Sequence, residues 1–376
     1  MQDLVRTSYR QNDVIILLKD LSFDMKEMST EEREKAIQNG IHYSEMLPQE
    51  KAPTIEYEKL YEKALNDKRF EIALGIGKVS EIMMNNSKDN KPIIISLARA
   101  GIPVGILMKR YIKEKYNLDI PHYAISIIRD KGIDENAMDY IYQKEIIENK
   151  NNVSNIFFVD GWTGKGAIKT QLEEAVKQLK HSKDAHVALR WKDLCDDLYV
   201  LADPANITPF RGTKEDFLLP SACLNSTVSG LTSRTILNHL IDTKNGDFHG
   251  AVYFSKFEEI DKSNDFLDII TKEFINIKLN NVKQEVLDGN IGMKIVNNIC
   301  ENFNILDFKK VKPGIGETTR VLLRRVPWKV LINTSLDDSD IQHILELCKE
   351  KNIPYETYPM GNYKVCGIIK ELSADA

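Results

Sequence analysis

The sequence predicts an α/β fold with a mainly parallel sheet and helices on both of its faces. Short apolar runs that favour strands alternate, over the first half of the chain, with longer amphipathic patterns that favour helices. This alternation is typical of a doubly wound sheet, in which ligands bind at the carboxyl ends of the strands. Two of the predicted strands, Ile93–Ser96 and Ile156–Val159, run into glycine-containing turns. We expect five or six strands in this sheet.

Composition sets broad limits on function. The chain has 376 residues, a net charge of −5 and 28% charged residues, so nothing global indicates binding to nucleic acid or membranes. No apolar run could cross a bilayer and the N-terminus lacks an apolar signal core, which indicates a cytoplasmic protein without membrane contacts. The five cysteines are scattered and form no CxxC pair, which argues against disulfides and structural zinc.

The first 90 residues predict mainly helices. Asp13–Leu21 is apolar enough for a short buried element. Ser29, with Glu32 three residues later, forms a capping-box pattern, so a helix is expected from there to about Gln38. Tyr57–Met84 has apolar residues at helical spacing and predicts one or two helices that pack against the sheet.

Two strands with polar turns come next. Ile93–Ser96 ends in a turn of small residues around Arg99, and a helix is expected to start near Pro103. The run Ile120–Arg129 is rich in β-formers and leads into a charged, glycine-containing segment that includes Lys131. Such a segment is usually a solvated loop.

The segment Asn155–Thr170 is the centre of the prediction. An apolar strand ends in Asp160 and turns through glycines into a helix that begins at Ala167. The start of a helix after such a turn is a common place to hold a phosphate, because backbone N–H groups and the helix dipole point at the anion. The phosphate-loop NTPase pattern is not satisfied, since Gly166 follows Lys165 where that motif needs Ser or Thr.

Two further strands are predicted at Ala185–Leu189 and Leu198–Ala202. The polar segment Phe210–Leu237 follows, dense in Ser, Thr, Asn and Gly. It is either an ordered loop over the site or the capped start of a helix at Ser229–Leu237.

The C-terminal part is locally basic. Seven basic residues and one acid lie between Lys309 and Lys329. A helix predicted at Ile315–Arg325 would place Glu317, Arg320 and Arg324 on one face, with Leu322 and Val326 toward the core. A strand at Val330–Asn333 and a helix at Ser339–Lys351 should follow. The basic face could bind RNA phosphates by counterion release.

Six segments together resemble a bacterial family of phosphoribosyltransferases from tellurite-resistance and stress-response gene clusters, with a fused pelota RNA-binding domain. Its members are also labelled cysteine proteases of the StiP type. The resemblance implies a type I phosphoribosyltransferase-like domain with an N-terminal helical extension and a hood over residues 1–303, then an α/β/α pelota-like domain over residues 304–376. The segments are HYSEMLP, SLARAGIPVG, HYAISIIRDKGIDENA, FVDGWTGKGAI, DFLLPSACLNSTVSGL and VKPGIGETTRVLLRRVPW.

The resemblance also implies an activity. The chain would be a Mg²⁺-dependent glycosyltransferase that uses 5-phosphoribosyl-1-pyrophosphate (PRPP). It would either transfer the phosphoribosyl group with release of pyrophosphate or catalyse phosphorolysis. The substrate acted on would be a base, a nucleoside-like metabolite or RNA. Asp160 would be catalytic and bind the metal, and Arg129 and Lys131 would stabilise the leaving pyrophosphate. The other implied sites are a 5-phosphate loop (Thr163, Gly164, Lys165, Gly166), a pyrophosphate loop (Ala98, Arg99, Ala100, Gly101), substrate-selecting hood residues (Asn225, Ser226, Thr227) and RNA-binding residues (Lys312, Gly314, Glu317, Arg320, Arg324, Arg325).

Alternatives stay open. The family usually has two adjacent acids where this chain has only Asp160, so a catalytically silent RNA-binding protein that senses PRPP or another nucleotide is one alternative. A cysteine protease is another, and it needs a thiolate near a His and an orienting Asn or Asp. Cys223 with His122 or His249 and with Asn225 is the candidate set. A homodimer is a further prediction.

Overall fold

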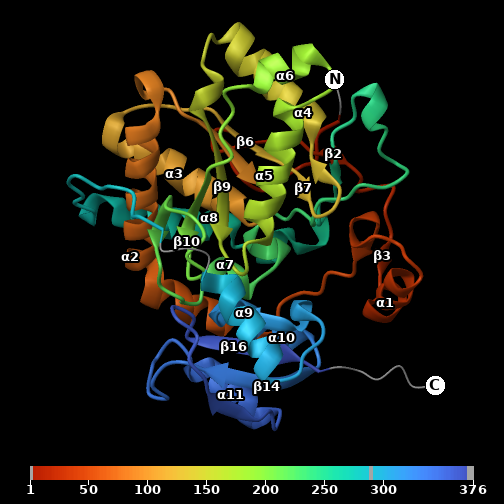
Figure 1. Ribbon diagram of the computed structural model, residues 1–376, viewed down its shortest axis with the longest axis vertical. Helices are drawn as coiled ribbons and strands as arrows, with labels where there is room; N and C mark the ends of the chain where they lie inside the picture. The colour runs from red at the N-terminus through yellow and green to blue at the C-terminus, as the bar shows by residue number, and fades with distance from the viewer. Residues whose placement is uncertain (1–2, 288–290, 371–376) are drawn as a thin grey trace.

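The computed structural model describes residues 3–287 and 291–370. It shows a large N-terminal domain and a smaller C-terminal domain that lies below it in Figure 1. No helix in the described ranges is long and apolar enough to cross a membrane. The side chains that are not described within these ranges are those of Thr30, Glu34, Gln38, Ala222 and Arg324.

A six-stranded sheet forms the centre of the N-terminal domain, in the order β1-β6-β5-β9-β10-β11, and every neighbouring pair is parallel. This confirms the predicted mainly parallel sheet, whereas the finer assignment to the type I phosphoribosyltransferase fold is not confirmed. The bounds are β1 Ile15–Ile16, β5 Ile93–Leu97, β6 His122–Ile125, β9 Ile156–Trp162, β10 Leu198–Ala202 and β11 Arg211–Thr213.

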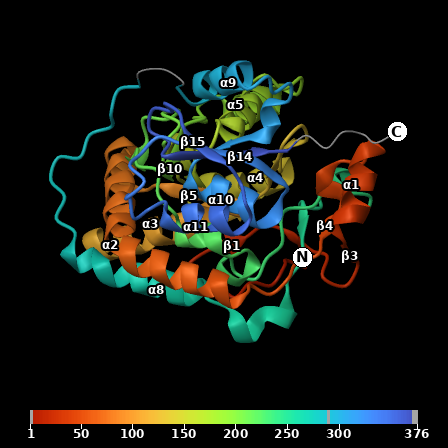
Figure 2. The ribbon, with the colours of Figure 1, turned by 90° about the horizontal axis from the view of Figure 1, so that it is seen from below.

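Helices cover both faces of this sheet, as predicted (Figures 1 and 2). Successive side chains of a strand point to opposite faces, so Phe157 belongs to one buried cluster and Phe158 to the other. One face carries α2 Ile55–Asn86, α3 Gly101–Tyr116 and α8 Ser263–Glu273, and the other carries α4 Glu135–Ile141, α5 Ala167–Lys180 and α6 Ala185–Trp191.

The long pattern predicted at Tyr57–Met84 is a single helix, α2, of 32 residues. It crosses β11 very closely at two glycines. A Cβ atom added to Gly212 would lie 2.3 Å from the backbone oxygen of Gly75. Only glycine at this position allows the helix and the strand to approach so closely.

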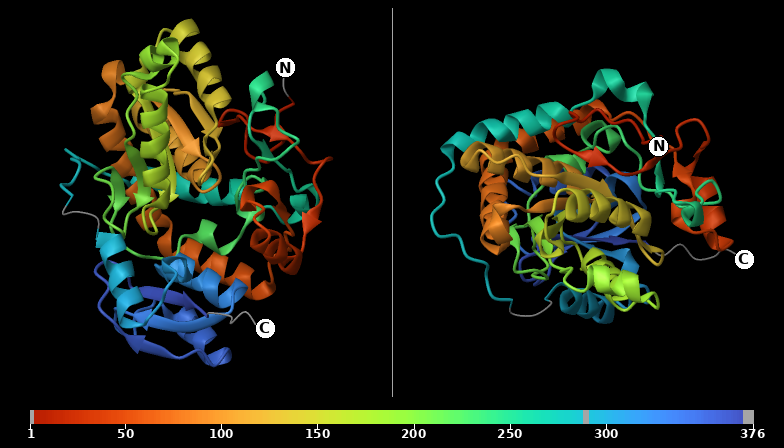
Figure 3. Two further views of the ribbon diagram at one scale, coloured as in Figure 1. Left: turned by 45° about the vertical axis from the view of Figure 1, so that its right-hand side comes forward. Right: turned by 90° about the horizontal axis from the view of Figure 1, so that it is seen from above.

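The predicted capping box is confirmed at α1, Thr30–Gln38. Ser29 Oγ accepts a hydrogen bond from the Glu32 backbone N–H at 3.3 Å, and Glu32 Oε2 accepts one from the Ser29 N–H at 2.7 Å. The helix lies at the margin of the N-terminal domain (Figure 3). The short strand pairs are β2 Lys19–Asp20 with β12 Gly250–Ala251, β3 Glu27–Met28 with β4 Leu47–Pro48, and β7 Ile127–Ile128 with β8 Gly132–Ile133.

The strand predicted at Ala185–Leu189 is wrong, because this segment forms α6. Asp184 caps the helix by accepting a hydrogen bond from the His186 N–H at 2.8 Å, and the side chain of Leu189 is 65% exposed. An apolar run this short does not distinguish a strand from a helix.

The segment Phe210–Leu237 begins with β11 and then continues as an ordered loop rather than as a long helix. It contains one short helix, α7 Pro220–Cys223, and a 3-10 turn at Ser226–Val228. The alternative of a helix that starts at Ser229 is therefore wrong. The helix α7 packs against α2 and against α10 of the C-terminal domain.

The C-terminal domain has a four-stranded sheet in the order β13-β16-β14-β15. The predicted core position Val326 is wrong: α10 ends at Arg324, and Val326 is 47% exposed. The bounds are α9 Ile291–Asn302, β13 Val311–Pro313, α10 Ile315–Arg324, β14 Pro327–Ile332, α11 Gln342–Glu350, β15 Tyr355–Thr357 and β16 Val365–Ile369.

The two faces of this smaller sheet are covered differently. The helix α9 packs on one face, in a buried cluster with residues of β13, β14 and β16. Buried residues of α10 and α11 belong instead to the same cluster as those of α2 and α7. One hydrophobic core therefore runs across the contact between the domains, while the predicted boundary between residues 303 and 304 stays a prediction.

Candidate functional site

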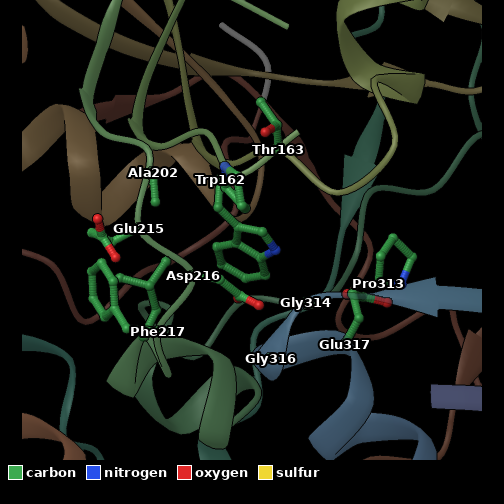
Figure 4. A pocket seen from close by; sticks show the side chains of 12 residues that line it. Trp162, Thr163, Ala202, Glu215, Asp216, Phe217, Pro313, Gly314, Gly316 and Glu317 are labelled. Carbon is green, nitrogen blue, oxygen red and sulfur yellow. The ribbon is translucent and has the colours of Figure 1, made fainter. Parts of the chain in front are cut away.

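The carboxyl ends of β9 and β10 meet the start of α10 where the two domains touch. We call this contact the domain seam. A cavity of about 20 Å³ lies in it, enough for about one water molecule. Its lining comes from both domains (Figure 4) and consists of Trp162, Thr163, Ala202, Pro204, Glu215, Asp216, Phe217, Leu219, Pro313, Gly314, Gly316 and Glu317.

The turn between β9 and α5, predicted as a phosphate loop, is covered by the C-terminal domain. Lys165 Nζ donates hydrogen bonds to the carbonyl oxygens of Phe308 and Val311, at 2.8 and 2.9 Å. The hydroxyl of Tyr363 donates to the carbonyl oxygen of Gly164 at 2.5 Å. The groups that the transferase prediction assigned to a sugar phosphate are thus in contact with protein.

The buried side chains of Asp203 and Arg211 support this turn through hydrogen bonds. Thr163 Oγ1 donates a hydrogen bond to Asp203 Oδ1 at 2.5 Å. Asp203 also accepts from Arg211 Nη1 at 2.9 Å and from the N–H groups of Ile207 and Thr208. Asp203 and Arg211 are almost fully buried, so the pair supports the loops around the seam rather than contacting a ligand.

Asp160, the predicted catalytic acid, is 8% exposed at the end of β9. Burial raises its pKa to about 7, although its carboxylate accepts a hydrogen bond from the Gly161 N–H at 2.8 Å. Such a carboxyl can gain or lose a proton near neutral pH. Within the described residues no group of three His, Cys, Asp or Glu side chains could hold a metal ion. The Mg²⁺ prediction rests on Asp160 alone and stays a prediction.

Asp216 joins the domains. It is 5% exposed and accepts hydrogen bonds from the N–H groups of Ile315, at the start of α10, and of Lys364, both at 2.9 Å. Burial raises the pKa of Asp216 to about 7, against the lowering effect of these two bonds. A side chain from the N-terminal domain therefore caps the first turn of a C-terminal helix.

The predicted pyrophosphate loop follows β5 and contacts the loop Phe210–Leu237. Arg99 Nη1 donates a hydrogen bond to the carbonyl oxygen of Thr232 at 3.0 Å. Arg129 and Lys131 are exposed. The pyrophosphate-binding roles implied for Arg99, Arg129 and Lys131 stay predictions.

The predicted hood residues Asn225, Ser226 and Thr227 bond within the N-terminal domain. Ser226 donates from both its N–H and its hydroxyl to Glu50 Oε1, each at 3.0 Å. The carbonyl oxygen of Thr227 accepts from the Lys262 N–H at 2.7 Å. None of the three hood residues lines the cavity in the domain seam.

The predicted RNA-binding residues lie in and next to α10. Lys312 and Gly314 precede the helix, Glu317 and Arg320 lie within it, and Arg325 follows its end. Arg320 forms an ion pair with Glu317 at 2.8 Å, and its guanidinium lies over the ring of Trp162, 5.1 Å from the centroid. Burial would raise the pKa of Glu317, but Arg320, Lys312 and Arg234 outweigh it and hold that pKa below its ordinary value. Three basic side chains therefore lie close to Glu317. The side chain of Arg324 lies outside the described residues.

Sequence reasoning missed three residues at this seam, namely Trp162, Asp216 and Arg234. Trp162 lies within the segment Asn155–Thr170, two residues after Asp160, but no role was predicted for it. Asp216 and Arg234 lie in a polar loop where no local pattern marks them.

The contacts observed for Cys223, His122 and His249 are with groups outside the candidate protease set. The thiol of Cys223 is 1% exposed and lies 4.0 Å from the carbonyl oxygen of Leu219. His122 Nε2 bonds Ser96 Oγ at 2.8 Å, and His249 Nδ1 bonds Ser126 Oγ at the same distance. Burial lowers the pKa of His122 to about 3 and that of His249 to about 4, so both imidazoles are neutral at pH 7.

The other cysteines show no activated thiol. Cys195 is exposed, Cys300 is half-buried, and Cys348 and Cys366 are buried. Burial raises the pKa of all four thiols, to about 11 for Cys348 and about 12 for Cys366. A nucleophilic cysteine normally has a lowered pKa.

Comparison with known proteins gives the family. Residues 7–271 match the family described as tellurite-like stress resistance cysteine protease StiP, and residues 290–371 match the PELOTA RNA binding domain. The chain is also similar to a protein named "Cysteine protease StiP" from Acinetobacter baylyi (strain ATCC 33305 / BD413 / ADP1). The two are 33% identical over 383 residues, which cover 97% of this chain and 94% of that protein.

These matches correct the predicted activity. The phosphoribosyltransferase prediction, with PRPP as substrate, is wrong, because both the family and the relative are named as cysteine proteases. The prediction of an enzyme is supported at that coarser level, since these names describe enzymes. The physical reason for the error is that a strand, an acid and a glycine turn before a helix occur in many parallel sheets. With a family match over residues 7–271 and a relative aligned over almost its whole length, the chain belongs to the StiP family and carries a C-terminal pelota domain.

Proposed function

We propose that this protein binds RNA through the basic side chains in and next to α10. The observation that carries this proposal is the group of basic side chains around Glu317, in a chain with net charge −5. There Arg320, Lys312 and Arg234 hold the pKa of the half-buried Glu317 below its ordinary value. The match of residues 290–371 to an RNA-binding domain supports the same conclusion.

The surroundings of Lys312 and Lys165 extend this charge. Burial lowers the pKa of Lys165 to about 8, and the nearby charges of Lys312 and Arg129 act in the same direction. Burial also lowers the pKa of Lys312, with Arg325 and Arg129 adding to the effect. A phosphate backbone would relieve this repulsion among cations, and its release of counterions would make binding depend on salt.

A fluorescence-anisotropy titration with a short labelled single-stranded RNA tests the proposal. The full-length chain should bind, and its affinity should fall linearly on a log–log plot against KCl concentration. The double variant Lys312→Gln/Arg325→Gln should bind more weakly, with a slope smaller by about 0.7 for each lost phosphate contact.

Lys144→Gln is the matched control. Lys144 is exposed, in the helical segment Tyr142–Glu148 that leads toward the start of β9, away from the carboxyl ends of the strands. This variant should bind RNA like the wild type. If Lys312→Gln/Arg325→Gln binds RNA with wild-type affinity and the same salt dependence, the basic face of α10 is not the RNA site.

Proteolysis is a second candidate function, favoured by the name of the 33% identical relative. His122 and His249 bond serines in this structure, so catalysis through either of them requires a rearrangement that brings its imidazole to a thiol. Degradation of a fluorescent casein that is lost in one Cys→Ser variant alone would support it. Activity that survives every such single substitution would exclude cysteine catalysis.

A further inference from the structure

We propose that the N-terminal domain supplies part of the RNA site: Arg99 and Arg234, together with Arg320 of α10, form one phosphate-binding site across the domain seam. The proposal rests on the RNA-binding function proposed above. It adds that the RNA backbone is held by both domains rather than by the pelota domain alone.

The side chains are placed from three different parts of the chain. Arg99 follows β5, and its Nη1 donates a hydrogen bond to the carbonyl oxygen of Thr232 at 3.0 Å. This bond holds the β5 turn against the loop that carries Arg234 two residues later. From the other domain, the Arg320 guanidinium reaches the ring of Trp162 at the end of β9, 5.1 Å from its centroid.

Cations outnumber carboxylates among the charged groups that act on the pKa of Arg234. The side chain of Arg234 is exposed, yet the surrounding protein lowers its pKa to about 10, and Arg99, Arg320 and Arg33 lower it further as neighbouring cations. Two carboxylates oppose these cations. Glu50 accepts two hydrogen bonds from Ser226, and Glu317 forms an ion pair with Arg320 at 2.8 Å. An arginine does not lose its proton at neutral pH, so an anion bound among these side chains would be attracted by all of them.

A phosphodiester is the anion that fits this arrangement. Guanidinium groups bind phosphate oxygens with paired, charge-assisted hydrogen bonds, and several such groups around one anion give a strong site. The neighbouring basic residues Lys312 and Arg325 of the C-terminal domain would contact further phosphates of the same strand. A chain of phosphates therefore matches the cluster better than a single small anion.

The test uses full-length Arg234→Gln in the RNA titration described above. Loss of one guanidinium–phosphate contact should weaken binding about tenfold and reduce the salt slope by about 0.7. Arg234→Lys keeps the positive charge but loses the planar guanidinium group. It should therefore retain the salt dependence of RNA binding but bind RNA more weakly than the wild type. Lys144→Gln again serves as the control and should bind like the wild type.

Thermal unfolding of the two proteins shows whether Arg234→Gln is correctly folded. Because Arg234→Gln removes a repelled charge, its melting temperature at low salt should equal or exceed that of the wild type. Inorganic phosphate should raise the melting temperature of the wild type more than that of the variant, since ligands stabilise the state that binds them. An equal rise in both proteins would overturn the proposal.

The outcomes separate this inference from the function on which it rests. If Arg234→Gln binds RNA with wild-type affinity and slope while Lys312→Gln/Arg325→Gln does not, the RNA site lies on the pelota domain alone and this proposal is wrong. If the wild-type chain does not bind RNA, both proposals are wrong.

Discussion

Replacing Asp216 with Asn should remove a pH dependence from the stability of the chain. The folded-state pKa of Asp216 is about 7, above its ordinary value of 3.8, because burial disfavours the carboxylate. Between about pH 4 and pH 7 the folded chain thus binds more protons at this carboxyl than the unfolded chain, so the free energy of unfolding rises as the pH falls through 7. Above pH 7 the contribution is absent.

The magnitude follows from the two pKa values. Between pH 8 and pH 5 this one carboxyl should add about 2.5 kcal/mol to the free energy of unfolding. The amide of Asn keeps one acceptor oxygen for the N–H groups of Ile315 and Lys364, so the variant should lose about 1–3 kcal/mol at every pH. The diagnostic quantity is therefore the difference between pH 5 and pH 8 and not the absolute stability.

Urea unfolding followed by tryptophan fluorescence provides the assay. Trp162 lies at the seam, Trp191 in the N-terminal core and Trp328 in the C-terminal sheet, so the signal reports both domains. Buried groups such as His122 also titrate, but they are shared by both proteins and cancel in the comparison. Asp119→Asn, which removes an exposed carboxylate, is the control. An equal change from pH 8 to pH 5 in wild type and Asp216→Asn would refute the reasoning.

Three further predictions concern packing, capping and thiol reactivity. Gly212→Ala should destabilise the chain by about 3 kcal/mol in thermal unfolding, because the added Cβ atom would meet the backbone of α2. Gly164→Ala should cost much less, because nothing lies within 4 Å of its added Cβ atom. Equal losses of stability would contradict the close approach of α2 and β11. Ser29→Ala should weaken α1 by about 1 kcal/mol, seen as faster hydrogen exchange there, and unchanged exchange would contradict the observed cap. Iodoacetamide at neutral pH should alkylate Cys195 first and slowly, as read by intact mass, and rapid modification of any other thiol would instead indicate an activated nucleophile.

Local sequence was sufficient for the elements that rest on local physics. The capping box at Ser29, the strand at Ile156–Val159 and the helix that begins at Ala167 were all predicted, because caps, apolar runs and helical periodicity lie within a few neighbouring residues. Ala185–Leu189 was not, since its short apolar run suits a strand and a surface helix equally and only the cap at Asp184 favours the helix.

For the candidate site, too, the sequence determined some features and the tertiary structure determined others. Sequence alone located the basic residues around α10, such as Lys312 and Arg320, because they are concentrated in one segment. Only the tertiary structure decided which groups face them across the seam, including Trp162 and Arg234. It also decided that Lys165, which suits a phosphate loop by its place in the chain, donates its hydrogen bonds to the C-terminal domain. The reason is that burial and charge at a site depend on segments distant in sequence, whose approach no local pattern records.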